Sequence, residues 1–143
     1  VLENIEHESG KKVWNVLQLR QHPSIIALKK KVEAADPSKI FDVDLTYITS
    51  RGKWYYSSWK GHDEKSGGIA TNIGIHFFDM LHYVFGRLQD NRVFLRTDSR
   101  AAGYLEYEKA RVSWFLSIEF EDLPKRLREQ GKRTFRFIVR SHL

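Results

Sequence analysis

Four polar side chains interrupt an otherwise apolar stretch, SGGIATNIGIHFFDMLHYVFG, at residues 66–86. They are Asn72, His76, Asp79 and Tyr83, and we call them the polar strip. In an α-helix these positions fall within a band roughly 60° wide. An imidazole and a carboxamide one turn apart can move a proton and orient a polar ligand near neutral pH. The pattern therefore predicts either the solvent edge of an amphipathic helix or one wall of a ligand cleft.

The start of the same stretch favours the cleft, because the small residues Ser66–Gly68 let a ligand approach backbone amides closely. A metal site is a weaker alternative. Asn72, His76 and Asp79 offer oxygen and nitrogen ligands on one face. Asparagine is a poor ligand for transition metals, however, and no second histidine has the spacing of a helical zinc site. We therefore predict no metal.

The preceding segment, SRGKWYYSSWKGHDEKSGG (Ser50–Gly68), has no periodicity and is predicted as a loop, whose length suggests a function. Its aromatic residues are Trp54, Tyr55, Tyr56 and Trp59, and its basic residues include Arg51, Lys53, Lys60 and Lys65. Aromatic rings beside cations suit single-stranded nucleic acid. They equally suit a nucleotide sugar, whose diphosphate or carboxylate meets the cations. The alternative is that the rings pack on the fold and the lysines are solvated.

Composition limits the class of protein. The chain has 143 residues, with 24 Lys and Arg against 18 Asp and Glu, and no cysteine. The net charge of +6 favours an anionic partner such as nucleic acid, a phosphorylated small molecule or an acidic sugar, or serves solubility alone. Without cysteine there is no disulfide or thiolate metal site, which suits the cytoplasm. No apolar run is long enough to cross a bilayer, so we expect no membrane association.

Residue periodicity predicts an α+β fold. Strands are predicted at Lys11–Arg20, Ile40–Thr49, Asn91–Asp98, Ala101–Glu108, Arg111–Phe120 and Arg133–Arg140, helices at His22–Ala35 and Ser66–Gly86, and a charged loop at Leu123–Lys132. Short connections between the later strands make those neighbours antiparallel. We therefore expect an open, mostly antiparallel sheet with helices on one face.

The same residues resemble a known family. Residues 66–86 are similar to the glycine-glycine … Asp-x-Gly-x-His-x-x-Asp segment of the glucose-fructose oxidoreductase and inositol dehydrogenase (Gfo/Idh/MocA) family. VWNVLQLRQHPSIIALKKKV, YITSRGKWYYSSWKG, GYLEYEKARVSWFLSI and EDLP…GKRTFR resemble one branch of that family. That branch comprises UDP-N-acetyl-2-amino-2-deoxyglucuronate 3-dehydrogenases, which make sugars of the lipopolysaccharide O-antigen. The likeness runs from about Lys11 to Arg136.

The resemblance implies a division into domains. Family members pair an N-terminal Rossmann domain, which holds NAD(P), with a C-terminal α+β domain that carries the substrate site. This chain resembles only the second domain, since it contains no strand–GxGxxG–helix unit and no Glu-Lys-Pro segment. We expect residues 1–34 to be the last Rossmann strand plus a connecting helix. Residues 35–143 are expected to form a substrate-binding and oligomerisation domain, shortened at its C-terminus.

The resemblance also implies roles for individual residues. His76 takes the position of the catalytic histidine, which accepts the hydroxyl proton as hydride leaves the sugar. Asn72 stands where many relatives carry aspartate and is expected to orient the sugar, because an amide cannot accept the proton. The resemblance therefore leaves two candidates for the base, His76 and the lysine of the Glu-Lys-Pro segment, which this chain lacks. Weaker candidates are Lys60 and Arg51 for the uronate or diphosphate, and Trp59 and Ser66 for the pocket lining. For Asp79 the expected role is structural, as an alternative to a role in the site.

The expected function is the substrate side of an NAD-dependent nucleotide-sugar dehydrogenase, with NAD favoured over NADP. Its expected partners are a UDP-sugar uronate, the missing Rossmann domain, and a second copy of the chain packed through the open sheet. The isolated fragment is expected to bind no cofactor and to be inactive. The alternative is a basic, non-catalytic module for nucleic acid or subunit assembly, of which nucleic acid is the less expected partner.

Overall fold

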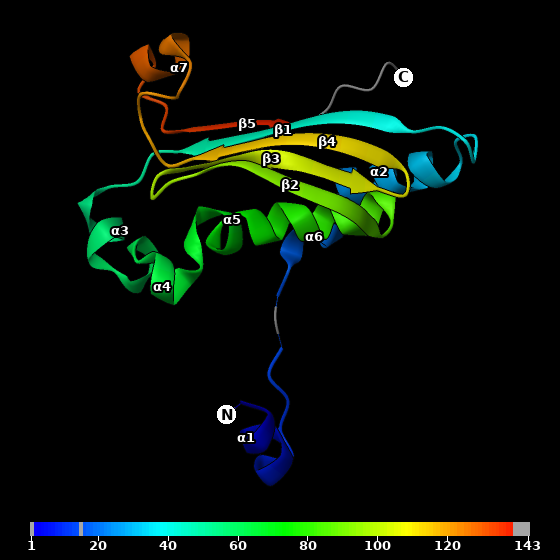
Figure 1. Cartoon of the computed structure of the whole chain (residues 1–143), viewed down its shortest axis with the longest axis horizontal. Helices are drawn as coiled ribbons and strands as arrows, with labels where there is room; N and C mark the ends of the chain where they lie inside the picture. The colour runs from blue at the N-terminus through cyan, green and yellow to red at the C-terminus, as the bar shows by residue number, and fades with distance from the viewer. Residues whose placement is uncertain (1, 15, 139–143) are drawn as a thin grey trace.

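The fold centres on a five-stranded sheet with helices on one face (Figure 1). The structure is a computed structural model that describes residues 2–14 and 16–138. The strands are β1 (Phe41–Thr49), β2 (Leu88–Arg96), β3 (Arg100–Tyr107), β4 (Ala110–Ser117) and β5 (Thr134–Ile138), in the order β2-β3-β4-β1-β5. β1 and β4 are parallel, and the other neighbouring pairs are antiparallel. The predicted open, mostly antiparallel α+β sheet is confirmed.

Side chains alternate across the sheet, as the sequence pattern requires. In β1 the side chains of Phe41, Val43 and Leu45 are buried toward the helices, while Asp42 and Asp44 between them are exposed. β4 shows the same alternation over its first half. The sheet therefore has one covered face and one open face.

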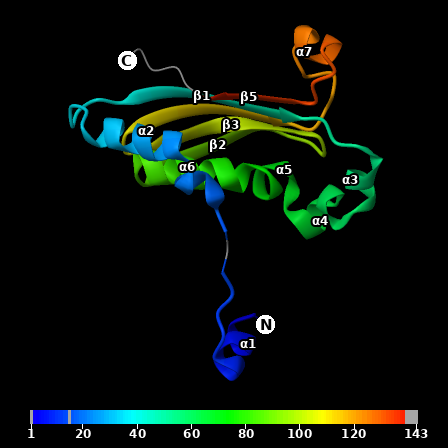
Figure 2. The ribbon, with the colours of Figure 1, turned by 180° about the vertical axis from the view of Figure 1, so that it is seen from behind.

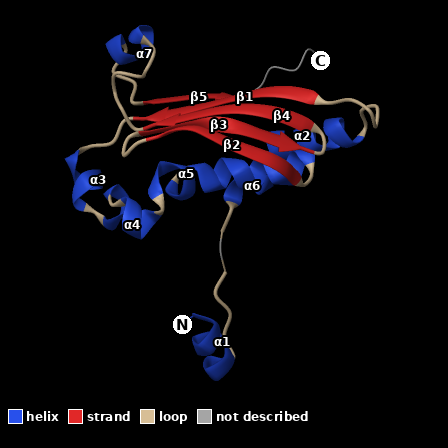
Figure 3. Cartoon of the chain, viewed as in Figure 1, coloured by secondary structure: helices blue, strands red, loops and turns tan. Residues whose placement is uncertain are grey.

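The covered face carries α2 (Pro23–Glu33), α5 (Gly68–Asn72) and α6 (Gly74–Phe85), as Figure 3 shows. α6 buries Phe77, Met80, Leu81 and Val84 in the core. Burial of one such side chain stabilises a fold by about 1.5–3 kcal/mol. α1 (Leu2–Ser9) has no buried residue and lies away from the sheet at the end of an extended segment (Figures 1 and 2).

The predicted strand at Lys11–Arg20 is wrong. Its described residues up to Leu17 have no regular secondary structure, and Gln18–Gln21 form a 3-10 helix, η1. An isolated strand is not stable in water without a neighbour to accept its hydrogen bonds. None of the five described strands pairs with this segment, so its alternating sequence pattern has no sheet to join.

Three further predictions need correction. The predicted loop Ser50–Gly68 folds as α3 (Lys53–Ser57), η2 (Trp59–Gly61) and α4 (Asp63–Ser66), and the predicted loop after Leu123 contains α7 (Lys125–Glu129). The predicted helix Ser66–Gly86 is two helices, α5 and α6, which meet at Ile73. Gly74 explains the break, because a Cβ there would lie 3.0 Å from Leu116 Cδ1 and closer still to the Phe78 ring. Glycine thus lets α6 start in close contact with β4.

The remaining strands are confirmed with shifted ends. β2 begins at Leu88 and ends at Arg96, and β4 ends at Ser117 rather than at Phe120. β5 matches the last predicted strand as far as Ile138. Val139 and Arg140, its predicted end, lie outside the described residues.

Asp122, in the connection between β4 and α7, forms hydrogen bonds that hold this connection to the ends of β3 and β4. Arg100 donates two hydrogen bonds to this carboxylate, at 2.7 and 3.0 Å, and the Ser117 hydroxyl donates a third at 2.6 Å. The bonds from Arg100 lower the pKa of Asp122, burial opposes them, and the bond from Ser117 adds to the lowering. The charged form of Asp122 is therefore favoured in the folded state.

We expect Asp122→Asn to lower the free energy of unfolding at pH 7 by about 1–2 kcal/mol, because hydrogen bonds to a charged group are lost. A carboxyl whose pKa is lowered by folding stabilises the fold above its unfolded-state pKa, and this contribution disappears as the pH falls through the folded-state pKa. The difference between wild type and variant should thus be full at pH 7 and shrink below about pH 4. Urea unfolding at several pH values measures it.

Asp42→Asn, on the open face without a hydrogen bond in the described structure, is the matched control and should change stability little at any pH. An Asp122→Asn effect of equal size at pH 3 and pH 7 would contradict the role given to the ionised carboxylate.

Candidate functional site

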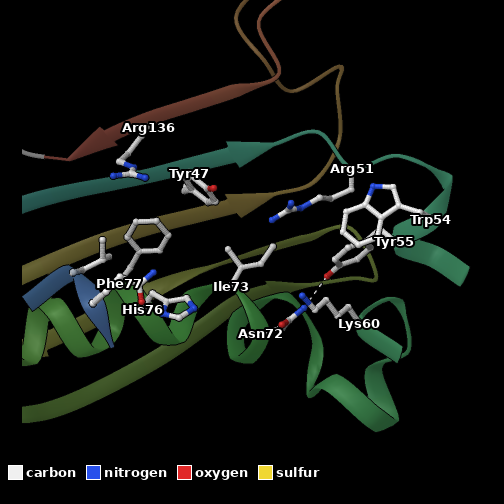
Figure 4. Close-up of a pocket in the computed structure, with 12 residues that line it drawn as sticks. Tyr47, Arg51, Trp54, Tyr55, Lys60, Asn72, Ile73, His76, Phe77 and Arg136 are labelled. Carbon is white, nitrogen blue, oxygen red and sulfur yellow. Dashed lines mark hydrogen bonds between the residues drawn. The ribbon is translucent and has the colours of Figure 1, made fainter. Parts of the chain in front are cut away.

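A pocket of about 270 Å³ lies on the covered side of the sheet, near the end of β1 (Figure 4). Its walls come from η1, the end of β1, the α3–η2 segment, the α5–α6 junction and β5. These elements are distant in sequence, so the pocket depends on the tertiary fold.

His76 and Asn72, the two leading residues from the sequence, both line this pocket. Asn72 is the last residue of α5, and its side-chain amide donates to the Tyr55 hydroxyl at 3.2 Å. His76 lies in the first turn of α6, and its Nδ1 atom is buried without a hydrogen-bond partner in the described part of the chain. A buried polar atom left unpaired costs about 1–3 kcal/mol, so a ligand that pairs with this ring would recover that cost.

Arg51 and Lys60 also line the pocket, on the side of the α3–η2 segment. The Arg51 guanidinium carbon lies 5.8 Å from the centre of the Tyr55 ring, and its Nε atom is buried with no hydrogen-bond partner among the described residues. Lys60 Nζ lies 5.8 Å from the centre of the Trp59 ring. Trp54, which is 57% exposed, adds a flat apolar surface beside them. This end of the pocket therefore combines two cations with an aromatic surface.

Arg136 lines the opposite end, and sequence reasoning missed it. It lies on β5, and its guanidinium carbon is 5.7 Å from the centre of the Tyr47 ring and 5.8 Å from that of Phe77. Figure 4 shows it across the pocket from Arg51 and Lys60. Nothing in the spacing of RTFRFIVR marks this arginine, because its place depends on β5 pairing with β1. The pairing of these two strands was not predicted.

Two weaker candidates from the sequence lie elsewhere. Ser66 is buried, and its hydroxyl accepts a hydrogen bond from the Gly68 N–H at 3.1 Å. Trp59 is 55% exposed and is outside the pocket lining, although it stacks with Lys60. The structure thus places Ser66 at the end of α4 and leaves both residues outside the pocket lining.

The other half of the polar strip has a structural task. Asp79 accepts two hydrogen bonds from the Arg20 guanidinium, one of them at 2.6 Å from Nε. These bonds raise the pKa of Arg20 above its ordinary value. Arg20 and Lys29 also lie over the Tyr83 ring, at 5.5 and 4.5 Å from its centre. Asp79 and Tyr83 therefore attach η1 and α2 to α6, which positions Gln18 and Leu19 as a wall of the pocket.

The described residues offer no obvious place for a metal or a dinucleotide. No group of three His, Asp or Glu side chains among them could hold a metal ion. Among the described strands, β1 and β4 form a parallel pair. Several helices and the strands β2 and β3 separate them in the sequence, and no GxGxxG turn follows β1, so this pair is not a Rossmann unit. No helix in residues 2–14 and 16–138 is long and apolar enough to span a membrane.

The comparison with known proteins identifies the family. The profile described as "Oxidoreductase family, C-terminal alpha/beta domain" (GFO_IDH_MocA_C) matches residues 29–123. The chain belongs to the Gfo/Idh/MocA family. The fold built from β1–β5, α2, α5 and α6 is therefore that of the family's C-terminal domain.

Solved structures agree with this assignment. The WlbA (WbpB) dehydrogenase of Thermus thermophilus, in complex with NAD and UDP-GlcNAcA, is 54% identical with a TM-score of 0.85, covering 96% of this chain and 44% of that one. The WlbA dehydrogenase of Bordetella pertussis, in complex with NADH and UDP-GlcNAcA, is 22% identical with a TM-score of 0.66, covering 78% and 38%. The second likeness shows the fold alone. The chain thus spans less than half the length of these Gfo/Idh/MocA structures.

Asp79→Asn should lower the free energy of unfolding by about 1–3 kcal/mol, because Asp79 is 8% exposed and the variant leaves Arg20 without its carboxylate. Glu33→Gln is the matched control, since Glu33 is 59% exposed and its ion pair with Lys29 should contribute at most about 0.5 kcal/mol. Urea unfolding of both variants measures the difference. Equal, small losses would contradict the attachment of η1 through Asp79.

Proposed function

We propose that this chain is the substrate-side domain of an NAD-dependent dehydrogenase that oxidises the 3-hydroxyl of a UDP-N-acetyl-hexosaminuronate. The observation that carries the proposal is that His76 and Asn72 share one pocket with Arg51, Lys60 and Arg136. The 54%-identical dehydrogenase with NAD and UDP-GlcNAcA supports the substrate class. The sequence resemblance places such chemistry in the making of O-antigen sugars.

The pocket suits part of such a substrate. Small-molecule sites in proteins measure about 300–1,000 Å³, and this one, at about 270 Å³, is slightly smaller. It can hold the sugar ring, while the nucleotide extends over the α3–η2 segment. The exposed rings of Trp54 and Trp59 offer an apolar surface there. Cations at both ends neutralise a ligand that carries negative charge at more than one position.

Each site residue has a distinct task in this proposal. His76 accepts the proton of the 3-hydroxyl, and Asn72, held by Tyr55, orients the sugar through hydrogen bonds. Because the amide of Asn72 cannot take a proton, the basic group on this chain is His76. NAD(P) supplies the hydride acceptor in this reaction class, and the described residues lack a fold that binds it.

The division of the chain follows from the same reasoning. We propose that residues 1–34 connect this domain to a Rossmann domain and that residues 35–143 carry the substrate and oligomer surfaces. Residues 10–14, 16 and 17 form no strand in this structure, and we propose that this part of the chain becomes a strand only when it joins the sheet of the Rossmann domain. The cytoplasmic location remains a prediction.

In the enzyme that carries this chain, His76→Ala should lower kcat for UDP-GlcNAcA by at least about 100-fold, because a general base is lost. KM should change much less, since the cations and Asn72 remain. His82→Ala is the matched control, because His82 is exposed on the same helix and lies outside the pocket. Steady-state kinetics measure both variants. Wild-type turnover in His76→Ala would refute the proposed role.

The open face of the sheet suggests a second copy of the chain as partner. Phe94 is 71% exposed on β2, and together with Phe115, Ala102 and Gly103 it lines a hollow on this face. Exposed apolar patches of this kind on a sheet are typical of subunit interfaces. We therefore infer a homo-oligomer in which two open faces pack together.

Phe94→Glu should convert the oligomer into monomers, because it places a charge in an apolar contact. Sedimentation velocity over a range of concentrations measures the mass. Ile5→Glu, an equivalent change at an exposed residue of α1, should leave the oligomer intact. A wild-type chain that stays monomeric at every concentration would contradict this interface.

A further inference from the structure

We propose that Arg136 binds the carboxylate of the hexuronate and so sets the preference for a uronate over a neutral sugar, while Arg51 and Lys60 bind the diphosphate. This inference rests on the proposed function and adds to it an assignment of each anionic group of the substrate to one end of the pocket. It also gives a role to a residue that the sequence did not single out.

The cations of the pocket form two separate groups. Arg136 lies against Tyr47 and Phe77, whose ring centres are 4.9 Å apart. Arg51 lies against Tyr55, which accepts the hydrogen bond from Asn72. Figure 4 shows the two groups at opposite ends, with Ile73 between them. The ion pairs found in residues 2–14 and 16–138 include neither arginine, so both guanidinium groups are available to a ligand.

The chemistry of the substrate matches two such ends. On a pyranose ring, C1 and C5 flank the ring oxygen, which lies opposite C3. When the 3-hydroxyl faces His76, the diphosphate on C1 and the carboxylate on C5 therefore point away from it in two diverging directions. A pocket with two cationic ends can contact both anionic groups at once. A neutral hexose would leave one end without a partner.

Three features assign the carboxylate to Arg136. The diphosphate carries more negative charge than the carboxylate, and the end near the α3–η2 segment has two cations where the β5 end has one. The nucleoside beyond the diphosphate needs an apolar surface, and the exposed rings of Trp54 and Trp59 lie at the two-cation end. The Arg136 guanidinium has two aromatic rings beside it where that of Arg51 has one, and these rings hold its planar fork ready for bidentate binding of a carboxylate.

The assignment also fixes the direction of the sugar ring. With the diphosphate at the Arg51 end, the substituent on C2 lies on the side of Asn72 and Tyr55, and the substituent on C4 lies on the side of Arg136. The amide of Asn72 is then placed toward the acetamido group, with which it can exchange hydrogen bonds.

The test compares two ligands and several variants of the enzyme that carries this chain by isothermal titration calorimetry. The ligands are UDP-GlcNAcA and UDP-GlcNAc, which differ only in the carboxylate. Arg136→Met should weaken UDP-GlcNAcA binding roughly 10- to 100-fold and UDP-GlcNAc binding less than about 3-fold. Arg51→Met should weaken both ligands by a similar factor. Arg126→Met, an exposed arginine of α7 outside the pocket, is the charge-matched control and should change neither.

Thermal unfolding of each variant establishes that it is folded. If Arg136→Met is not, Arg136→Lys, which keeps the charge and loses the fork, should show a smaller loss that is still confined to UDP-GlcNAcA. Equal losses for both ligands in the Arg136 variants would overturn the assignment and leave the proposed function standing. So would a loss of the uronate preference in Arg51→Met.

A different result would count against the proposed function itself. If the wild-type enzyme binds neither sugar nucleotide, or instead binds a single-stranded oligonucleotide in a salt-dependent way, the sugar pocket is refuted together with the role of Arg136.

Discussion

The apolar face of α6 packs against β1 and β4, and this contact determines where the polar groups of the site can lie. Phe77 meets Tyr47 on β1, with ring centres 4.9 Å apart, and Phe78 meets Trp114 on β4 at 5.2 Å. Gly74 brings the start of the helix close to Leu116. Because α6 cannot rotate without breaking these contacts, His76 is held at the edge of the buried layer, where the pocket opens.

Within this arrangement the polar strip serves two purposes. Asn72 and His76 face the pocket, while Asp79 and Tyr83 hold Arg20 and Lys29. The second pair positions one wall of the pocket, because it holds Arg20 of η1 and the neighbouring Leu19 lines the pocket. On α6, the supporting residues Asp79 and Tyr83 thus lie about one and two helical turns after His76.

Much of the fold could be predicted from the sequence because its patterns are local. The alternation in FDVDLTYIT predicts β1, and the apolar spacing of GIHFFDMLHYVF predicts α6. Asn72 and His76 were found because they interrupt that apolar pattern. The break at Ile73 was not predicted because it depends on a close approach to β4. The strand at Lys11–Arg20 was wrongly predicted because an alternating pattern forms a strand only beside a partner strand, which the described part of the chain does not supply.

The site residues that were missed have the same explanation. Arg136 belongs to a short strand at the sheet edge, and only its pairing with β1 brings it to Tyr47 and Phe77. Ser66 and Trp59 were selected by their position in the segment that resembles the family, yet local hydrogen bonding and exposure place them outside the lining. Proximity along the chain was a poor guide where short helices fold the segment back on itself.

The placement of Arg136 on β5 has a consequence for how the protein acquires its site. The pocket draws residues from η1, near the beginning of the chain, and from the last described strand. During synthesis the earlier walls emerge first, and the cavity stays open on one side until β5 leaves the ribosome and docks beside β1. Contacts between such distant segments form late and slowly, because the intervening loop must close first. Ligand recognition should therefore mature only after β5 has been translated and has paired with β1.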